Sequence, residues 1–417
     1  MLKRRKFDQD EQDLCDNFVI DMHEYIIGAT RSGKSNYLMT LTDREEPFAF
    51  IDKHGTTARQ IADAIPCIYW RPADLEFPIG LNPLQNVPPD ERWKVTADIV
   101  SVFSDIWKLG PETPRLLYLL RSALRLLLDN HGTTLLDIRR VLADDTYRSR
   151  LLRKSTDTET AQTWSEFNTK DDRQKATEIG SLQNKVAALA DPLPLRFVIG
   201  QRTSTISIPK ILTNRQTLIV DLSDMGDEPA ALLGALIINT FKQAAEASKT
   251  PHPYRLYIDE FQNFGTSTVA TILSESGKRE LWLTLAHQFI SQLDEQVRDA
   301  VLGNCQTIVS FRVGAKDAPI IGDAIDWNPQ NLQDLGRGKA RVRTLINNSP
   351  SGAYLLETER AELETGYLAA NVRNTRANYA RPREIVEDSL RPFRKSRWSK
   401  WDQRTTMRVN LENRDDL

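Results

Sequence analysis

The stretch from Tyr25 to Leu41, YIIGATRSGKSNYLMTL, decides the fold of this chain. Gly28 to Ser35 match the pattern G-x-x-x-x-G-K-[ST], with an apolar strand-like run before them and a helix-forming run after them. Glycines let consecutive backbone amides point inward around a phosphate at the N-terminus of a helix. The sequence therefore predicts a strand–loop–helix unit that binds nucleotide phosphates through Gly28, Ala29, Thr30, Arg31, Ser32, Gly33, Lys34 and Ser35.

Two side chains of this loop have the chemistry that a magnesium–nucleotide complex needs. The Lys34 ammonium is expected to bridge the β- and γ-phosphates of ATP, and the Ser35 hydroxyl is expected to ligate Mg²⁺. The alternative is a chance match, and the strand and helix on either side of the loop argue against it.

A second apolar run, RLYIDEF at residues 255–261, ends in two adjacent carboxylates followed by Phe261. Asp259 is expected to hold Mg²⁺ directly or through water, and Glu260 is expected to polarise the attacking water. Adjacent carboxylates repel each other unless a cation or a hydrogen-bond donor compensates, which favours a functional site. The alternative is a solvated strand end or a helix N-cap.

A third apolar run, LWLTLAHQ at residues 281–288, ends in His287 and Gln288. A strand beside that of the two carboxylates would place Gln288 near the γ-phosphate, where it orients water or reports hydrolysis; His287 is the alternative. Asp52 is expected near the phosphate loop, whereas His54 is expected to pack or hydrogen-bond rather than to catalyse. The five histidines form no H-x-x-x-H pair, which argues against zinc.

Short apolar runs alternate with helical stretches along most of the chain. Several runs are apolar throughout, as is typical of strands buried on both faces of a parallel sheet, and ligands bind beyond the carboxyl ends of such strands. Residues 88–192 instead carry helical periodicity, with a leucine stripe at Leu116, Leu117, Leu120, Leu124, Leu127 and Leu128. We therefore predict an α/β fold with a mainly parallel sheet, interrupted by an all-α insertion domain. The predicted strands are Tyr25–Ile27, Phe48–Asp52, Cys67–Tyr69, Thr217–Asp221, Leu256–Asp259, Leu281–Leu285 and Thr307–Phe311.

Composition narrows the class of protein. Apolar residues make up 40% and charged residues 27% of the 417 residues, which excludes a disordered chain. Cys15, Cys67 and Cys305 are odd in number and far apart, which argues against a disulfide framework and suits a reducing cytosol. No run reaches the ~18 apolar residues that span a bilayer, and the basic start lacks the apolar region of a signal peptide. We expect a cytoplasmic protein with no membrane span of its own.

The end of the chain, residues 373–408, is basic, and Trp398 and Trp401 lie among its cations. Cations mixed with aromatic rings are typical of surfaces that contact nucleic acid, although a solvated tail and a partner-docking arm are equally open. The net charge of −2 indicates no nucleic-acid partner by itself. The predicted division is a core of residues 1–87 and 193–372, a helical insertion of residues 88–192, and a basic C-terminal tail of residues 373–417.

Six motifs occur in an order and spacing that resemble a known family. They are Gly28–Ser35, Asp52–Gly55, Gly80–Leu84, Tyr257–Phe261, Leu285–Gln288 and Gly303–Gly314. Together they resemble the FtsK/HerA branch of P-loop ATPases, and most of all the soluble motor of type IV secretion coupling proteins, the TraD/TraG-like conjugative DNA-transfer ATPases. The resemblance covers about residues 24–388, and the predicted helical insertion is similar to the all-α domain of those proteins.

The resemblance implies a RecA-like ATPase core that forms a ring, usually a homo-hexamer, and hydrolyses ATP with Mg²⁺ between subunits. Such rings pull single- or double-stranded DNA through a central pore. Gln288 matches the sensor glutamine of the family, and a neighbouring subunit usually supplies an arginine finger for the γ-phosphate. Relatives often have Glu-Ala-Arg-Lys where this chain has Gly277, so the finger is Lys278, Arg279 or Arg312.

Two other functions stay open at this stage. Coupling proteins usually carry N-terminal membrane helices, which the sequence does not lead us to expect here, so a secretion role would require a protein partner such as a secretion component. The alternative function is a nucleotide-gated hexameric scaffold for an effector, for example a nuclease or a defence protein, with slow and DNA-independent turnover. A small-molecule P-loop kinase is disfavoured by the helical insertion and by the paired carboxylates. DNA stimulation of ATP hydrolysis separates a motor from a scaffold.

Overall fold

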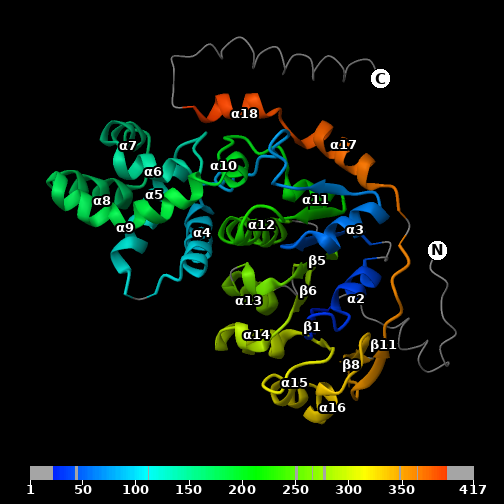
Figure 1. The fold of residues 1–417 in the computed structure, drawn as a ribbon. Helices are drawn as coiled ribbons and strands as arrows, with labels where there is room; N and C mark the ends of the chain where they lie inside the picture. The colour runs from blue at the N-terminus through cyan, green and yellow to red at the C-terminus, as the bar shows by residue number, and fades with distance from the viewer. Residues whose placement is uncertain are drawn as a thin grey trace.

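The computed structural model describes residues 22–42, 46–110, 112–248, 252–264, 266–275, 279–346, 349–363 and 365–391. A large twisted sheet runs through its centre (Figure 1). Its nine strands are β1 (Glu24–Ile27), β2 (Phe48–Asp52), β3 (Ile68–Trp70), β4 (Leu218–Asp221), β5 (Tyr254–Asp259), β6 (Leu281–His287), β7 (Thr307–Ser310), β8 (Lys339–Arg343) and β11 (Tyr354–Glu357). Two further short strands, β9 (Leu345–Ile346) and β10 (Ser349–Pro350), pair antiparallel with each other.

The strand order is β11-β8-β7-β1-β6-β5-β2-β4-β3. The seven strands from β7 to β3 run parallel, while β8 and β11 add an antiparallel pair at one edge. This sheet confirms the predicted α/β class with a mainly parallel sheet. All seven predicted strands occur, with ends that differ from the prediction by two residues or fewer.

Helices cover both faces of the sheet, as Figure 1 shows. The alternation of side chains along β1 explains why both faces are apolar: Ile26 packs with Leu38 on one face, whereas Tyr25 belongs to the larger core cluster on the other. One face carries α2 (Lys34–Leu41) and α3 (Thr56–Ala64); the other carries α12 (Asp227–Ala247), α13 (Thr266–Glu275) and α14 (Glu295–Asn304).

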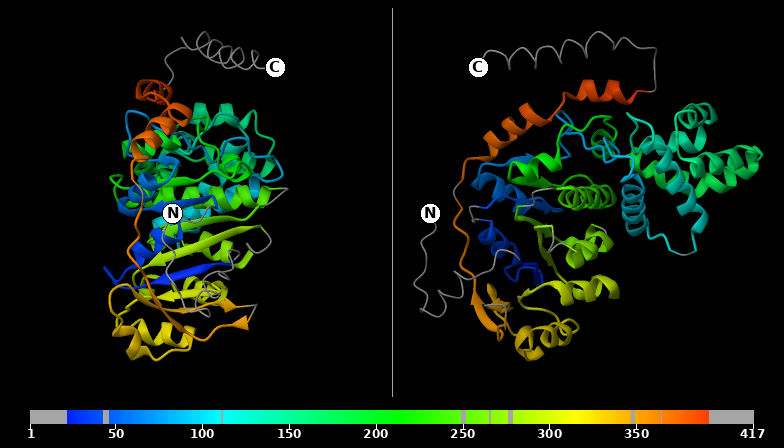
Figure 2. Two further views of the ribbon diagram at one scale, coloured as in Figure 1. Left: turned by 90° about the vertical axis from the view of Figure 1, so that its right-hand side faces the viewer. Right: turned by 180° about the vertical axis from the view of Figure 1, so that it is seen from behind.

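The chain between β3 and β4 is helical, and the structure describes no strand between residues 71 and 217. The leucines predicted to form an apolar stripe lie on α5, and all of them except Leu117 are buried. These helices project to one side of the sheet (Figure 2), and α4 packs against α12 of the core. The helices are α4 (Arg92–Trp107), α5 (Pro114–Leu128), α6 (Asp137–Ala143), α7 (Asp145–Leu152), α8 (Thr158–Asn168), α9 (Asp172–Ala190) and α10 (Leu193–Ile199), with α11 (Ile208–Thr213) leading into β4. Where the domains divide stays a prediction.

After β7 the chain forms α15 (Ala318–Ile325) and α16 (Pro329–Gln333), and after β11 it runs along α2 and α3 to α17 (Leu368–Tyr379) and α18 (Arg383–Leu390) (Figure 2). Helix α17 covers the edge strand β3, since the Tyr69 amide donates to Thr375 Oγ1 at 2.9 Å and the Cys67 amide donates to Asn371 Oδ1 at 3.1 Å. The tryptophans of the predicted basic tail lie outside the described residues.

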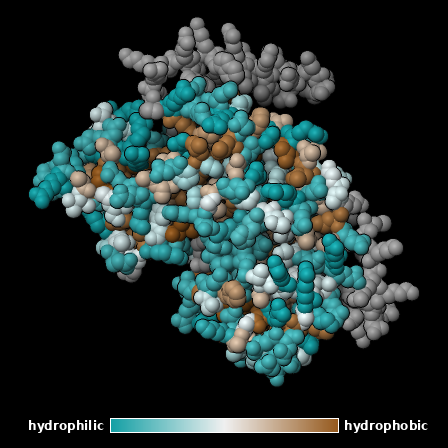
Figure 3. Space-filling view, viewed as in Figure 1, coloured by the Kyte–Doolittle hydropathy of each residue, from teal (hydrophilic) through white to brown (hydrophobic). Residues whose placement is uncertain are grey.

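The register of the parallel strands gathers polar residues at one edge of the sheet. Asp52 at the end of β2 lies opposite Asp221, and Asp259 at the end of β5 lies opposite Ala286, the neighbour of His287. On the face seen in Figure 3, hydrophilic residues cover most of the surface and apolar residues form scattered groups. No helix among the described residues is long and apolar enough to cross a membrane.

Candidate functional site: a nucleotide site at the carboxyl edge of the sheet

The loop between β1 and α2 needs both of its glycines. Gly33 has a φ of +130°, which L side chains rarely adopt, and a Cβ there would lie 3.1 Å from the Cα of Gly338. A Cβ on Gly28 would lie 2.5 Å from the Cβ of Phe311. Arg31 has a φ of 62°, a left-handed conformation that is uncommon for residues other than glycine. The loop is therefore shaped by backbone constraints that its sequence pattern predicted.

The N-terminus of α2 presents unpaired backbone amides. The amides from Gly33 to Asn36 have no acceptor within the helix, and Gly33 has no side chain that could cap them. The positive end of the helix dipole lies at the same place. This arrangement favours a bound anion, and a phosphate group fits the exposed amides.

Lys34 follows the loop with a buried side chain. Its ammonium donates hydrogen bonds to the carbonyl oxygens of Gly28 and, at 3.5 Å, Ala29. Burial lowers the pKa of Lys34, while the nearby carboxylates of Glu260 and Asp259 act in the opposite direction. The ammonium thus folds back over its own loop, and a phosphate would offer it a stronger, charged acceptor.

Two segments from elsewhere in the chain support the loop. The carbonyl of Arg312, just beyond β7, accepts a hydrogen bond from the Ala29 amide at 2.7 Å. The amide of Gly338 donates to the Ser32 carbonyl at 2.8 Å, and the Gly338 carbonyl in turn accepts from the Thr358 amide at 2.7 Å. The loop is therefore held between β7 and the start of β8.

Asp259 ends β5 with its side chain buried. Burial, together with the charges of Asp52 and Glu260, raises its pKa to about 7, and Lys34 only partly opposes this. Asp52 is itself engaged, since its carboxylate accepts from the amides of His54 at 2.8 Å and Ala58 at 3.0 Å. The charge of Asp259 is the one that lacks compensation, and a cation would stabilise it.

The residues present fit a Mg²⁺ ion that arrives with a nucleotide. No group of three or more His, Cys, Asp or Glu side chains in the described part of the chain could hold a metal by itself. Mg²⁺ typically takes one or two protein oxygens and fills its other positions with phosphate oxygens and water. The exposed Ser35 hydroxyl and the Asp259 carboxylate can supply such oxygens. Their role as metal ligands stays a prediction.

Glu260 is held by side-chain amides. It is buried with a left-handed φ of 53°, and its Oε1 accepts from Gln288 Nε2 at 2.7 Å, while its Oε2 accepts from Gln262 Nε2 at 2.7 Å. The Oε1 of Gln288 accepts from the Thr30 hydroxyl at 2.8 Å. A continuous chain of hydrogen bonds thus joins the phosphate loop to Glu260.

The neighbouring histidines occupy different environments. His287 is fully buried, and burial followed by the charge of Lys34 lowers its pKa to about 3. The backbone of Phe289 only partly opposes this shift, and the centroid of the ring lies 5.4 Å from that of Tyr25 and 5.0 Å from that of Phe261. His287 is therefore neutral and lies in the core, while Gln288 reaches the loop. His54 is exposed.

The two arginine-finger candidates that the structure describes lie at opposite ends of the parallel strands. Arg312 is exposed beside the phosphate loop of its own subunit, as its bond with Ala29 shows. Arg279 lies just before β6 and donates to the Glu246 carbonyl at 3.2 Å, at the edge away from the loop. Lys278 lies outside the described residues.

Two residues of this site were not predicted from the sequence. Gln262 bonds the Glu260 carboxylate, and Asn263 Nδ2 donates to the Glu260 carbonyl at 2.8 Å. Both residues come soon after the paired carboxylates in the sequence. Polar side chains after an apolar strand are the sequence signal that could have identified them as part of the site. The role of the Gly338 turn depends on a contact across about 300 residues of sequence, which no local pattern reveals.

Comparisons with known proteins agree with this fold. A family model described as "TraM recognition site of TraD and TraG" matches residues 253–320, which contain Asp259, Glu260 and Gln288. The solved structure of the plasmid coupling protein TrwB in complex with ADP and Mg²⁺ matches with a TM-score of 0.63 and 16% identity over 84% of this chain and 88% of that one. VirB4 of Thermoanaerobacter pseudethanolicus matches with a TM-score of 0.58 and 14% identity over 82% and 90%. Among curated protein sequences, none matches this chain.

These likenesses confirm the fold predicted from the sequence. The chain has a RecA-like P-loop ATPase fold, and it resembles the motor part of type IV secretion coupling proteins. At sequence identities of 16% and below, structural similarity is evidence for the fold alone. The activity therefore has to be argued from the site.

Proposed function

We propose that this protein is a Mg²⁺-dependent ATPase of the coupling-protein type that moves DNA through a ring of identical subunits. The observation that carries the proposal is the hydrogen-bonded chain from Thr30 through Gln288 to Glu260. A loop that only bound nucleotide would not require a buried carboxylate linked to it in this way. Such a link favours hydrolysis at the γ-phosphate.

Each residue has a role that its position supports. The amides of Gly33 to Asn36 and the Lys34 ammonium hold the phosphates, and Lys34 moves from the Gly28 carbonyl to a phosphate oxygen. Glu260 polarises the attacking water, while Gln288 can use its second N–H to contact the γ-phosphate. Bound Mg²⁺, on Ser35 and Asp259, would neutralise charge on the phosphate oxygens.

The similar structures support nucleotide binding without strong selection for the base. TrwB has been solved with ADP and Mg²⁺, with a GTP analogue and with an ATP analogue. We extend nucleotide and Mg²⁺ use to this chain because its loop has the same pattern of glycines, lysine and serine.

The ring and the DNA follow from the resemblance and are the finer part of the proposal. In a homo-hexamer, each nucleotide would lie between subunits and Arg279 of the neighbour would reach the γ-phosphate. Its place at the edge of the sheet away from its own loop supports action across the subunit boundary. The matching family model is described as a recognition site for another protein, TraM, which supports a protein partner that binds within residues 253–320.

The test is steady-state ATP hydrolysis by the purified protein, without DNA and with single- or double-stranded DNA, beside Glu260→Gln. We expect DNA to raise turnover by roughly tenfold or more, which corresponds to about 1.4 kcal/mol of barrier, and the variant to be inactive. Slow hydrolysis that DNA does not stimulate, with ATP binding intact, would overturn the proposed motor function and favour the nucleotide-gated scaffold.

A further inference from the structure

The carboxylate of Glu260 is held at both of its oxygens by amides from different elements. Gln288 follows β6 and bonds Oε1, whereas Gln262 lies in the short 3₁₀ helix η1 (Phe261–Asn263) and bonds Oε2. One contact would fix the position of a carboxylate oxygen but leave the group free to rotate. Two contacts on two oxygens fix the plane of the carboxylate as well.

The orientation of the Gln262 amide leaves its own oxygen without a hydrogen-bond partner in the described part of the chain, which indicates that the bond from its nitrogen is the important one. Its Oε1 is buried and has no hydrogen-bond partner among the described residues, which is a destabilising arrangement for an acceptor. Turning the amide over would satisfy neither side, because it would direct Oε1 at the Glu260 carboxylate. The bond to Glu260 therefore outweighs the unpaired oxygen.

The backbone of this turn has other supports, so Gln262 is not required to build it. Asn263 Nδ2 donates to the Glu260 carbonyl at 2.8 Å, and Lys53 donates to Asn263 Oδ1 at 3.1 Å. These bonds hold the left-handed backbone of Glu260 from the end of β2. What remains for Gln262 is the carboxylate itself.

We propose that Gln262 is a positioning residue, which fixes the Glu260 carboxylate in the plane required to polarise the attacking water. The inference rests on the proposed ATPase function. A neutral amide suits this role because it orients the carboxylate and leaves its negative charge in place, whereas a lysine or arginine would neutralise that charge. Gln288 alone leaves Oε2 without this restraint.

The test compares Gln262→Leu with Gln292→Leu in steady-state ATP hydrolysis. Leucine keeps a similar volume and removes the amide, and Gln292 is an exposed glutamine beyond Gln288 that is not one of the two amides bonded to Glu260. We expect Gln262→Leu to lower kcat about tenfold with the KM for ATP unchanged, and Gln292→Leu to leave both unchanged. Gln262→Glu, of the same size but negatively charged, should lower kcat further.

A double-mutant cycle separates positioning from a general structural effect. In a Glu260→Asp background, which keeps a carboxylate but draws it back by one methylene, Gln262→Leu should have little further effect on single-turnover hydrolysis, because the two-oxygen restraint is already lost. An equal loss in both backgrounds, or a loss of ATP binding in parallel with kcat, would overturn the inference. So would an unchanged kcat in Gln262→Leu. If that variant does not fold, Gln262→Asn, which is shorter by one methylene, carries the same expectations.

These outcomes are distinct from failure of the proposed function. Wild-type protein that hydrolyses no ATP, or Glu260→Gln that hydrolyses as fast as wild type, contradicts the ATPase proposal itself. Hydrolysis that requires Glu260 but has the same kcat in Gln262→Leu as in wild type contradicts only the positioning role of Gln262.

Discussion

Gly33 combines a φ of +130° with close neighbours on two sides, because a Cβ added there would lie 3.0 Å from the Phe311 ring and 3.1 Å from the Gly338 Cα. Gly33→Ala should therefore destabilise the protein by about 1–3 kcal/mol and abolish stabilisation by ATP. Thermal unfolding with and without Mg–ATP measures both effects.

Gly303→Ala is the matched control for this substitution. Gly303 lies within α14, and nothing would lie within 4 Å of its added Cβ. Alanine there should stabilise the helix by about 0.5–1 kcal/mol and leave the ATP response intact. A Gly33→Ala protein as stable and as responsive as wild type would show that the loop does not need the left-handed conformation.

Asp259 shows what sequence alone reveals of a site residue and what it does not. Its place after an apolar strand and beside Glu260 predicted a metal ligand, but only the fold shows that Asp259 is buried and that the charge of Asp52 also raises its pKa. The pairing of Glu260 with Gln262 depends on a left-handed turn after β5. No local pattern predicts such a turn at a glutamate, because left-handed φ is uncommon outside glycine.

Replacing Asp259 should stabilise the metal-free protein. Its folded pKa of about 7 lies above the ordinary value of 3.8, so folding disfavours the charged form, and the penalty is complete above about pH 7. Asp259→Asn should therefore raise the unfolding free energy at pH 8 in EDTA by on the order of 1 kcal/mol, with little gain below pH 4. The same variant should lose the extra stabilisation that Mg²⁺ adds to ATP.

Chemical unfolding at pH 8 and pH 4 measures this difference. Asp52→Ala is the control, because it removes a neighbouring charge but also the acceptor of the His54 and Ala58 amides at the start of α3, so it should destabilise. A lower stability of Asp259→Asn at pH 8 without metal would contradict the assignment of an uncompensated charge.

At the scale of elements, the seven parallel strands were predictable and the antiparallel pair of β8 and β11 was not. The seven predicted strands are apolar runs, and burial on both faces is what makes them so. Strand β8, with the sequence KARVR, alternates buried Ala340 and Val342 with charged side chains, and the edge strand β11 is half exposed. Short alternating runs that contain charged residues resemble loop sequences, and only the partner strand shows that they pair. For this reason β8 and β11 were not predicted from the sequence.

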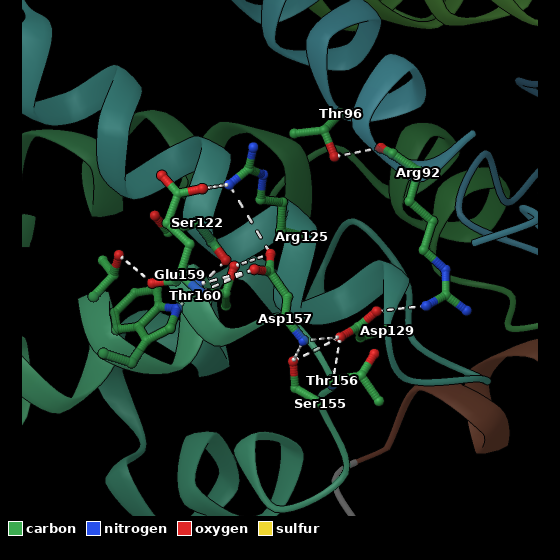
Figure 4. A network of polar contacts seen from close by, with 12 residues as sticks. Arg92, Thr96, Ser122, Arg125, Asp129, Ser155, Thr156, Asp157, Glu159 and Thr160 are labelled. Carbon is green, nitrogen blue, oxygen red and sulfur yellow. Dashed lines mark hydrogen bonds and ion pairs between the residues drawn. The ribbon is translucent and has the colours of Figure 1, made fainter. Parts of the chain in front are cut away.

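The helical insertion depends on a polar network around Asp129 as well as on its leucines (Figure 4). Asp129 accepts from Arg92 Nη1 at 2.5 Å, from the Ser155 hydroxyl at 2.6 Å and from the Thr156 amide at 3.0 Å, so it joins α4, the end of α5 and the segment before α8. Burial would raise the pKa of Asp129, but these donors, with that of Asp157, lower it overall. The charged form therefore stabilises the folded state.

Asp129→Asn should consequently destabilise the insertion at neutral pH. The stabilisation from a lowered carboxyl pKa is present above the ordinary value of 3.8 and is lost as the pH falls through the folded pKa. We expect a loss of about 1–3 kcal/mol at pH 7, and a smaller difference from wild type at pH 3. Limited proteolysis and thermal unfolding at both values measure it, with exposed Asp172→Asn of α9 as control. An equal difference at pH 7 and pH 3 would contradict the role of the charge.

At the scale of the whole molecule, the two arginine candidates differ because the length of β6 separates Arg279, but not Arg312, from the site. Arg279 precedes β6, whereas Gln288 follows it, and seven residues of strand span roughly 20 Å. Arg279 thus cannot reach the phosphates of its own subunit, while Arg312, beside Ala29, lies next to its own loop. The proposed ring makes these positions functionally different: Arg279 would act across a boundary, and Arg312 within a subunit.

Mixing two inactive variants tests that difference. Arg279→Ala and Glu260→Gln subunits should each be inactive alone, but a mixed ring contains sites where an intact Glu260 faces an intact Arg279 of the neighbour. We therefore expect ATP hydrolysis to recover on mixing, up to about a quarter of the wild-type rate if subunits combine at random and act independently. Arg312→Ala mixed with Glu260→Gln should give no recovery, since both defects then affect the same subunit's own site. Recovery with Arg312→Ala and none with Arg279→Ala would reverse the assignment, because it would place Arg312 at the boundary.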